Sequence, residues 1–341
     1  MRERSSLPKL VFFGLLVQAA LLLHPASCIA DSAFGAKRVG VLTISESARP
    51  MGNSPQQTPS SLWEPFFRTL RGRGWIEGQN VIFEYRDAGD DPRHFDKPAA
   101  ELVALKVDVL FPIGPPAVRA AFAATRDIPI IAHDLETDPV VAGYAQTYAV
   151  PGRNLTGLFL DTPDLAEKWV ELLKTMMPRL SRAVVLWDST SGPIPLSAVR
   201  RIAPSYGIKL QVIEIRKPEE IDKAPSLFAG RPQAVIILPS PMMYYESKRL
   251  ARMIGKQRLP ASSMFTPFPR EGGLFAYGPE LGAAAERCAD LLAKVLSGAK
   301  PGNLPIERPT KFEFVVNAKT AGALGITIPD SILLRADEVI K

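Results

Sequence analysis

The sequence predicts an α/β protein of two lobes, each with a parallel β-sheet covered by helices, joined by a hinge of several strands. Two observations lead to this prediction. Short apolar runs alternate with helical periods along most of the chain, and this series occurs twice over segments of similar length. Of 341 residues, 46% are apolar and 22% charged, which excludes a disordered or fibrous chain and is enough for two cores.

The first thirty residues (1–30) are predicted to be a secretory signal peptide and not part of the fold. A basic start precedes an apolar run, Leu10–Leu23, and small residues follow up to a cleavage site after Ala30. A membrane anchor is the alternative, but the run is shorter than the ~20 residues that span a bilayer. Cys28 offers a second route, lipidation, although the residue three places before it is not the usual Leu. We therefore expect an exported protein.

The first series, 37–157, is predicted to form lobe 1. Arg38–Ile44 is apolar nearly throughout, as in a strand that is buried on both faces. Ser61–Arg71 follows as a helix, with Ser61 and Glu64 as a capping box. The next elements alternate between strand and helix: Val81–Arg86, Pro92–Leu105, Val107–Pro112, Pro116–Thr125 and Ile128–Ala132. Such alternation favours a parallel sheet with helices on both faces.

The pattern begins again after Asn154–Leu160, and 158–277 is predicted to form lobe 2. Thr162 starts a helix, and strands follow at Arg182–Trp187, Lys209–Ile215 and Ala234–Leu238. The late elements are a strand, a helix closed by Gly298, and another strand: Gly273–Tyr277, Glu280–Leu296 and Lys311–Val316. We expect 278–305 to complete lobe 1 and 311–341 to complete lobe 2, so the chain crosses between the lobes more than once.

Residues suited to catalysis are sparse, so we expect no enzymatic activity, no cofactor and no metal. Beyond the signal peptide only His94 and His133 remain as histidines, and Cys288 lies on the apolar side of its predicted helix. The sequence has no G-x-S-x-G elbow and no Walker-type phosphate loop. One loop does hold four possible metal ligands, but a single loop rarely supplies a whole coordination shell: His133, Asp134, Glu136 and Asp138.

The loops that follow the parallel strands are the predicted binding site, because ligands of such folds bind at the carboxyl ends of the strands. These loops are Ser45–Arg49, Ile113–Pro116 and His133–Asp138 in lobe 1, and Asp188–Gly192 and Pro239–Tyr245 in lobe 2. From these loops and the crossings we select eight candidate ligand-binding residues: Ser45, Ser47, Gly114, Asp134, Asp161, Asp188, Ser240 and Tyr277. Any one of them alone is equally typical of a helix cap or an exposed side chain.

Six segments carry a resemblance to a known family. They are Leu70–Arg86 (LRGRGWIEGQNVIFEYR), Leu102–Val109 (LVALKVDV), Asp138–Val140 (DPV), Pro151–Gly157 (PGRNLTG), Gly273–Pro279 (GLFAYGP) and Leu304–Val339. With them the sequence resembles periplasmic substrate-binding proteins of ABC importers, in the uncharacterised-solute branch that includes tryptophan-linked binding proteins. The resemblance implies the type I periplasmic-binding fold: two Rossmann-like lobes that trap a small organic solute on closing. It also implies a periplasmic location, a monomer, and a membrane permease and an ATPase as partner chains.

The loop Ile113–Ala117 departs from the family pattern. The family usually has small hydroxyl residues here, in a pattern like G-T/S-P-A, whereas this chain has Ile113-Gly114-Pro115-Pro116-Ala117. The two prolines remove backbone donors, and the hydroxyl is missing. We therefore expect a solute that is less polar or larger than is usual for the family, with aromatic or branched character.

Two other functions remain for comparison, and a third is excluded. A periplasmic sensor that docks on a membrane receptor needs the same export and the same closing cleft. A secreted α/β enzyme requires a catalytic set built from His94, His133 and nearby carboxylates. A transcription regulator of this fold is excluded by the signal peptide and by the lack of an N-terminal helix-turn-helix. Nucleic-acid binding is also not expected, because the formal charge is only +6 and no Lys/Arg block reaches five residues.

Overall fold

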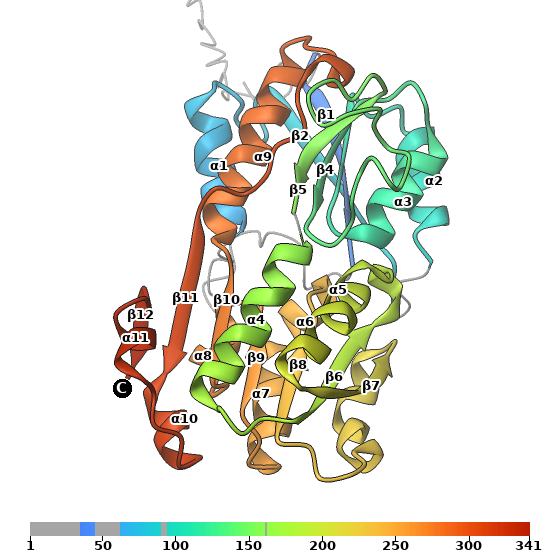
Figure 1. Ribbon diagram of the computed structural model, residues 1–341. Coiled ribbons are helices and arrows are strands. Elements are labelled where there is room, and N and C mark those ends of the chain that lie inside the picture. The colour runs from blue at the N-terminus through green and yellow to red at the C-terminus, as the bar shows by residue number, and fades with distance from the viewer. Residues whose placement is uncertain (1–34, 45–61, 90–93, 161) are drawn as a thin grey trace, which may run out of the picture.

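The computed structural model describes residues 35–44, 62–89, 94–160 and 162–341. These residues form two α/β lobes, one above the other in Figure 1, each built around its own sheet. The predicted fold class is confirmed. The predicted signal peptide and Cys28 lie outside the described residues, and within those residues no helix has the length and apolar character needed to span a membrane.

The first sheet has five parallel strands in the order β2-β1-β3-β4-β5. The strands are β1 (Lys37–Thr43), β2 (Val81–Asp87), β3 (Val109–Pro112), β4 (Ile130–Asp134) and β5 (Leu155–Phe159). Its helices are α1 (Trp63–Gly72), α2 (Asp96–Ala104), α3 (Pro115–Ala124) and, from the far end of the chain, α9 (Leu281–Leu296). Val41 and Leu42 pack into different apolar cores. Strand β1 is apolar along its length because both of its faces are covered.

Helix α1 begins after Leu62, its N-cap, which makes no side-chain cap. Ser61, the predicted partner of Glu64 in a capping box, lies outside the described residues. With Leu62 as N-cap, the third helical residue is Pro65, which has no N–H group that could donate a hydrogen bond to a capping side chain. Helix α9 lies beside α1, where Arg68 pairs with Glu286 (2.7 Å) and Arg73 with Asp290 (2.8 Å).

The second sheet has seven strands in the order β12-β11-β10-β9-β8-β6-β7. The strands are β6 (Arg182–Asp188), β7 (Lys209–Ile215), β8 (Ala234–Ile237), β9 (Ala261–Ser263), β10 (Phe275–Pro279), β11 (Phe312–Asn317) and β12 (Glu338–Ile340). Its α-helices are α4 (Thr162–Met176), α5 (Ile194–Ile202), α6 (Pro241–Tyr245), α7 (Ser247–Lys256), α8 (Pro267–Arg270), α10 (Ala318–Ala323) and α11 (Asp330–Leu333). Short 3₁₀ helices are η2 (Ser189–Ser191), η3 (Ala203–Tyr206), η4 (Pro218–Leu227) and η5 (Pro301–Asn303). Strands β10 and β11 pair antiparallel, so this sheet is mostly and not wholly parallel.

In the part of the chain that the structure describes, three segments run between the two lobes (Figure 1). They join β5 to α4, β10 to α9, and Glu307 to β11. The Glu307 segment is held beside β5, because Phe159 N–H donates to Glu307 O and Glu307 N–H donates to Gly157 O, each at 2.9 Å. The indole N–H of Trp169 donates to Tyr277 O at 2.7 Å, which ties α4 to β10.

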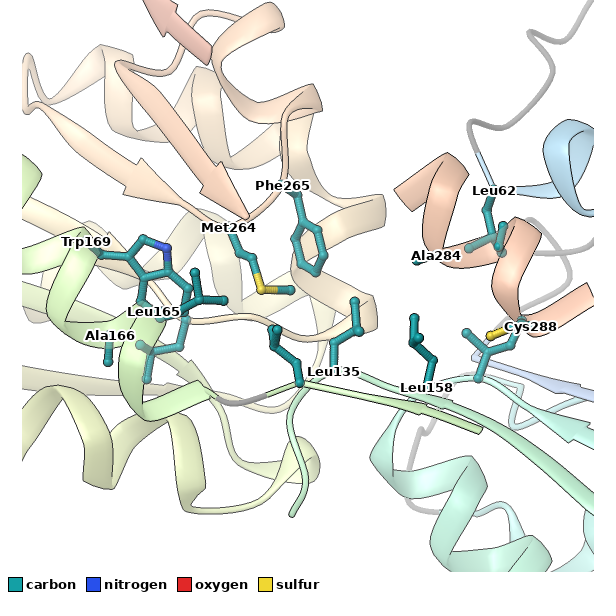
Figure 2. Packing of buried hydrophobic residues seen from close by; sticks show 14 of the residues in the cluster. Leu62, Leu135, Leu158, Leu165, Ala166, Trp169, Met264, Phe265, Ala284 and Cys288 are labelled. Carbon is teal, nitrogen blue, oxygen red and sulfur yellow. The ribbon is translucent and has the colours of Figure 1, made fainter. Parts of the chain in front are cut away.

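A continuous band of apolar side chains passes from one lobe to the other beside this hinge. Figure 2 shows the band running from Trp169 in α4, past Leu135 and Phe265, to Leu158 and Cys288 in the upper lobe. All five side chains are buried. The lobes therefore share one core next to the hinge, while each also has a separate core of its own.

Candidate functional site

The end of β4 and the loop that follows it contribute buried polar groups to the space between the lobes. His133 and Asp134, the last residues of β4, are 6% exposed and fully buried, and Glu136 in the loop is 3% exposed. The Oδ1 atom of Asp134 accepts hydrogen bonds from the backbone N–H groups of Glu136 and Thr137, both at 3.0 Å. These bonds hold the loop in a turn and leave the other carboxylate oxygen, Oδ2, buried without a hydrogen-bond partner among the described residues.

The second lobe presents a similar group at the ends of β6 and β8. Asp188 Oδ1 accepts hydrogen bonds from Thr190 N–H (2.9 Å) and from the Thr190 hydroxyl (2.6 Å). Ser240 caps α6, where its Oγ accepts from Met243 N–H at 3.1 Å. Asp188 and Ser240 are both at most 2% exposed. Carboxylate and hydroxyl oxygens of both lobes therefore meet at the carboxyl ends of the strands, as this type of sheet favours.

A cavity of about 40 Å³ lies between the lobes. The first lobe and the start of α9 supply Leu62, Ile113, Gly114, His133, Leu135, Glu136 and Leu281, and the second lobe supplies Pro241, Tyr244, Tyr245 and Phe265. Most of this lining is apolar or aromatic, with Glu136 and His133 as the polar exceptions. A space of this size holds a few water molecules but not an organic solute, so the described arrangement is a closed one that must open for a ligand.

Two direct contacts join the lobes across the cleft. A Cβ atom placed on Gly114 would lie 2.4 Å from Cγ of Pro241, so only glycine permits this approach. Gly114 also has φ of +86°, a conformation that disfavours other residues. The guanidinium of Arg119, in α3, donates to Thr190 O at 3.3 Å. Helix α3 and the loops after β6 and β8 thus meet in the closed form.

Burial shifts the ionisation of the first-lobe groups. Desolvation raises the pKa of Asp134 to about 6, against hydrogen bonds from the backbone and the charge of Arg119, which lower it. The pKa of Glu136 is raised well above its usual value, first by desolvation and then by the negative charges of Asp134 and Asp188. Desolvation lowers the pKa of His133 to about 4, so this imidazole is neutral at pH 7.

Acidic groups of both lobes border the same cleft. Burial raises the pKa of Asp188 too, although hydrogen bonds from Thr190 and Ser240 oppose the shift. Glu136 lines the cavity together with Pro241, and Ser240, the residue before Pro241, is the one that hydrogen-bonds Asp188. Such a site suits a ligand group that carries positive charge and hydrogen-bond donors.

The N-terminus of α3 is poorly suited to hold an anion. Its first two residues are Pro115 and Pro116, which have no N–H groups, and Gly114 N–H is already bound to His133 O at 2.8 Å. The donors predicted to be missing from this loop are therefore missing in the structure as well.

The predicted site residues divide into three groups. Gly114 lines the cavity, Asp134 and Ser240 stand next in sequence to residues that line it, and Asp188 hydrogen-bonds Ser240. Tyr277 lies elsewhere: it lines a hinge groove of about 430 Å³ and stacks on Phe312 with ring centroids 6.0 Å apart. Ser45, Ser47 and Asp161 lie outside the described residues.

Sequence reasoning did not select Glu136, Arg119, Tyr244, Tyr245 and Phe265 as ligand residues. Glu136 and the tyrosines stand in loops that were singled out, so position after a strand was a usable signal. Phe265 follows β9, a strand of three residues that is too short to recognise by periodicity. Arg119 is an exposed helix residue with no distinguishing signal in the sequence.

Other hollows are larger but less suited to be the binding site. The hinge groove and a surface hollow of about 510 Å³ beside α7 are each lined largely by one lobe or by exposed, paired charges. The small cavity between the lobes is preferred because it is lined by residues of both lobes, among them the buried Glu136 and His133, whose Nε2 has no hydrogen-bond partner among the described residues. In the part of the chain that the structure describes, no group of three His, Cys, Asp or Glu residues is arranged to hold a metal ion.

Comparison with known proteins gives consistent results. The model of a family described as ABC transporter substrate binding protein matches residues 63–340. A tyrosine-binding protein of Clostridioides difficile (strain R20291) is 24% identical over 263 residues, which are 76% of this chain and 75% of that protein.

Solved structures share the fold. A conserved domain protein from Vibrio cholerae has a TM-score of 0.79 at 25% identity, covering 89% of this chain and 99% of that one. A Streptococcus pneumonia ABC domain in complex with L-Trp scores 0.76 at 22% identity, covering 89% and 100%. The ligand-free, open structure of the substrate-binding protein CD0873 from Clostridium difficile scores 0.59 at 22% identity, covering 90% and 99%.

Proposed function

Because this chain belongs to the family of ABC transporter substrate binding proteins, which bind a small solute for a membrane permease, we propose that its solute is an amino acid with an apolar or aromatic side chain. The observation that carries this proposal is the pairing of acidic groups from both lobes with an aromatic wall. Glu136 lies in the same small cavity as Tyr244, Tyr245 and Phe265. The acids suit the ammonium group of an amino acid, and the aromatic rings suit its side chain.

The comparisons support the same class of solute. One relative is named as a tyrosine-binding protein, and one neighbour of the same fold holds L-Trp. The apolar lining also agrees with the less polar solute expected from the prolines of the 113–117 loop.

The proposed cycle begins with the lobes apart. A solute entering the cleft gains contacts from both lobes only when they close, so binding favours the closed form. The Gly114–Pro241 contact and the Arg119–Thr190 hydrogen bond form at the same time. We propose that the closed protein, after export to the periplasm and as a monomer, delivers the solute to permease and ATPase subunits without any catalysis of its own.

A thermal-shift screen of the purified protein against L-amino acids, sugars, dicarboxylates and purines tests this proposal. A ligand at ~100 times its Kd adds about 2.7 kcal/mol to stability, so an apolar or aromatic amino acid should raise the Tm by several degrees. Tyr245→Ala should remove most of that shift, whereas Tyr206→Ala, on the surface helix η3, should keep it. Hits confined to sugars, dicarboxylates or purines would contradict the proposed class.

A further inference from the structure

Buried carboxyl groups of both lobes border the cavity between them. Glu136, of the first lobe, lines it together with Pro241 of the second, and Ser240, the residue before Pro241, hydrogen-bonds Asp188. Asp134, two residues before Glu136, is fully buried. Among the described residues, none that lines the cavity is a Lys or Arg. Arg119 lies outside this lining, where it donates to Thr190 O and its charge acts on Asp134.

A second observation indicates that a ligand belongs at this place. Within the described part of the chain, His133 Nε2 and Asp134 Oδ2 are buried and have no hydrogen-bond partner. His133 lines the same cavity as Glu136, and it is 6% exposed. Buried polar atoms without partners are costly, and a bound group commonly supplies what they lack. Both atoms can accept a hydrogen bond, since a neutral imidazole has one acceptor nitrogen.

We propose that a primary ammonium group of the solute lies between Glu136 and Asp188, and that its positive charge allows the two lobes to close. This inference rests on the proposed function and makes it specific. An ammonium group has three N–H donors and a full positive charge, which match the two facing carboxylates and the acceptor of His133. Without such a cation, closure brings carboxylates together in a dry space, where their repulsion is strong.

Closure and charge recognition are then one event. Glu136 belongs to the first lobe and Asp188 to the second, so each can keep its negative charge in water while the lobes are apart. The ammonium group joins the two acids when they approach. A solute of the same shape without this charge leaves the repulsion in place, and it should bind weakly even if its apolar part fits.

The first experiment compares matched probes by calorimetry. We expect L-tyrosine or L-tryptophan to bind at least about 100-fold more tightly than its deaminated acid, 3-(4-hydroxyphenyl)propanoate or indole-3-propanoate. The corresponding amines, tyramine and tryptamine, should retain measurable binding. Equal affinity of an amino acid and its deaminated acid would overturn the ammonium inference while leaving the proposed function standing. Binding of the amines alone would support the inference and contradict the amino-acid class.

The second experiment needs no solute at all. Small-angle X-ray scattering at pH 8 should show a smaller radius of gyration for Glu136→Gln than for the natural chain, because the substitution removes the repulsion that opposes closure. Glu219→Gln, which removes an exposed carboxylate of the second lobe, is the control and should leave the radius unchanged. An unchanged radius for Glu136→Gln, with all probes failing to bind, would overturn the inference. The same unchanged radius with charge-selective binding would overturn only its closure step.

Discussion

His133 and Asp134 are consecutive residues of β4 whose burial shifts their ionisation in opposite senses. Desolvation lowers the pKa of His133 to about 4 and raises that of Asp134 to about 6. Between pH 4 and 6.5 the unfolded chain holds more protons at the histidine, whereas the folded chain holds more at the aspartate. The histidine therefore makes the protein more stable as the pH rises through this window, and the aspartate makes it less stable.

A substitution separates the two effects. His133→Asn removes the histidine and keeps a polar group of similar size. We expect the stability of the natural chain relative to this variant to increase by about 2–3 kcal/mol between pH 4.5 and 7, from the shift of His133. Urea unfolding at the two pH values measures it. A stability difference that is the same at both pH values would rule out the burial of His133 as the cause.

Gly114 matters at the residue scale because two separate requirements meet there. Its φ is +86°, and a Cβ atom would lie 2.4 Å from Pro241 Cγ of the other lobe. We predict that Gly114→Ala weakens solute binding on the order of 10- to 100-fold, because the added methyl group keeps the lobes from closing fully. Gly192→Ala is the matched control: its φ is +94°, but a Cβ atom there would meet nothing within 4 Å.

These two variants separate backbone strain from blocked closure. Both should lose about 1 kcal/mol of stability, since both place a side chain where glycine is preferred. Only Gly114→Ala should lose solute affinity and compaction on binding, as read by calorimetry and scattering. Similar affinity losses in the two variants would point to strain alone.

At the scale of elements, the strands and long helices could be predicted and the short ones could not. The runs Arg38–Ile44 and Arg182–Trp187 became β1 and β6 because their apolar character follows from burial on both faces. Strand β9 and helix α8 have three and four residues, which is too few for any periodicity. The antiparallel pairing of β10 with β11 also depends on where the chain returns from lobe 1, and a local pattern carries no information on that return.

The link between α4 and β10 is an element-scale feature that can be tested. The Trp169 indole donates to Tyr277 O on a hinge strand, and the Trp187 indole donates to Gly192 O within the second lobe. Trp169→Phe and Trp187→Phe should each cost about 1–3 kcal/mol of stability, for one lost hydrogen bond and a smaller ring. Only Trp169→Phe should change the radius of gyration measured without solute. A change in both would place the effect outside the hinge.

For the whole molecule, the candidate site shows where prediction from sequence stops. Ligands of such folds bind at the carboxyl ends of parallel strands, and this rule placed Asp134 at the strand ends of the first lobe and Asp188 and Ser240 at those of the second. It could not show which loops face each other, because that depends on the angle between the lobes. Tyr277 illustrates this limit: it lies on a hinge strand as predicted, yet its ring lines the hinge groove and not the cleft.

The acids facing each other also predict how solute affinity depends on pH. A bound ammonium group favours the charged forms of Asp134, Glu136 and Asp188, so binding releases the protons that burial retains on them. The pKa of His133, about 4, lies below the range concerned. Burial raises the pKa of Tyr144 to about 12 and that of Tyr245 further, so neither phenol titrates there.

Affinity for an amino acid should therefore rise between pH 5 and 7. Each carboxyl group that must lose its proton on binding contributes an increase of about tenfold per pH unit while it is still protonated. Calorimetry in buffers of different ionisation heat measures the number of protons released at pH 6. We expect at least about half a proton, because Asp134 with its pKa of about 6 is half protonated at that pH and Glu136, whose pKa is also raised, adds to the release. Asp134→Asn keeps an oxygen that can accept from Glu136 and Thr137 but has no proton to lose, so its affinity should depend less on pH. Proton uptake on binding to the natural chain would contradict a cation between the acids and would instead indicate that the solute is recognised through its own negative charge.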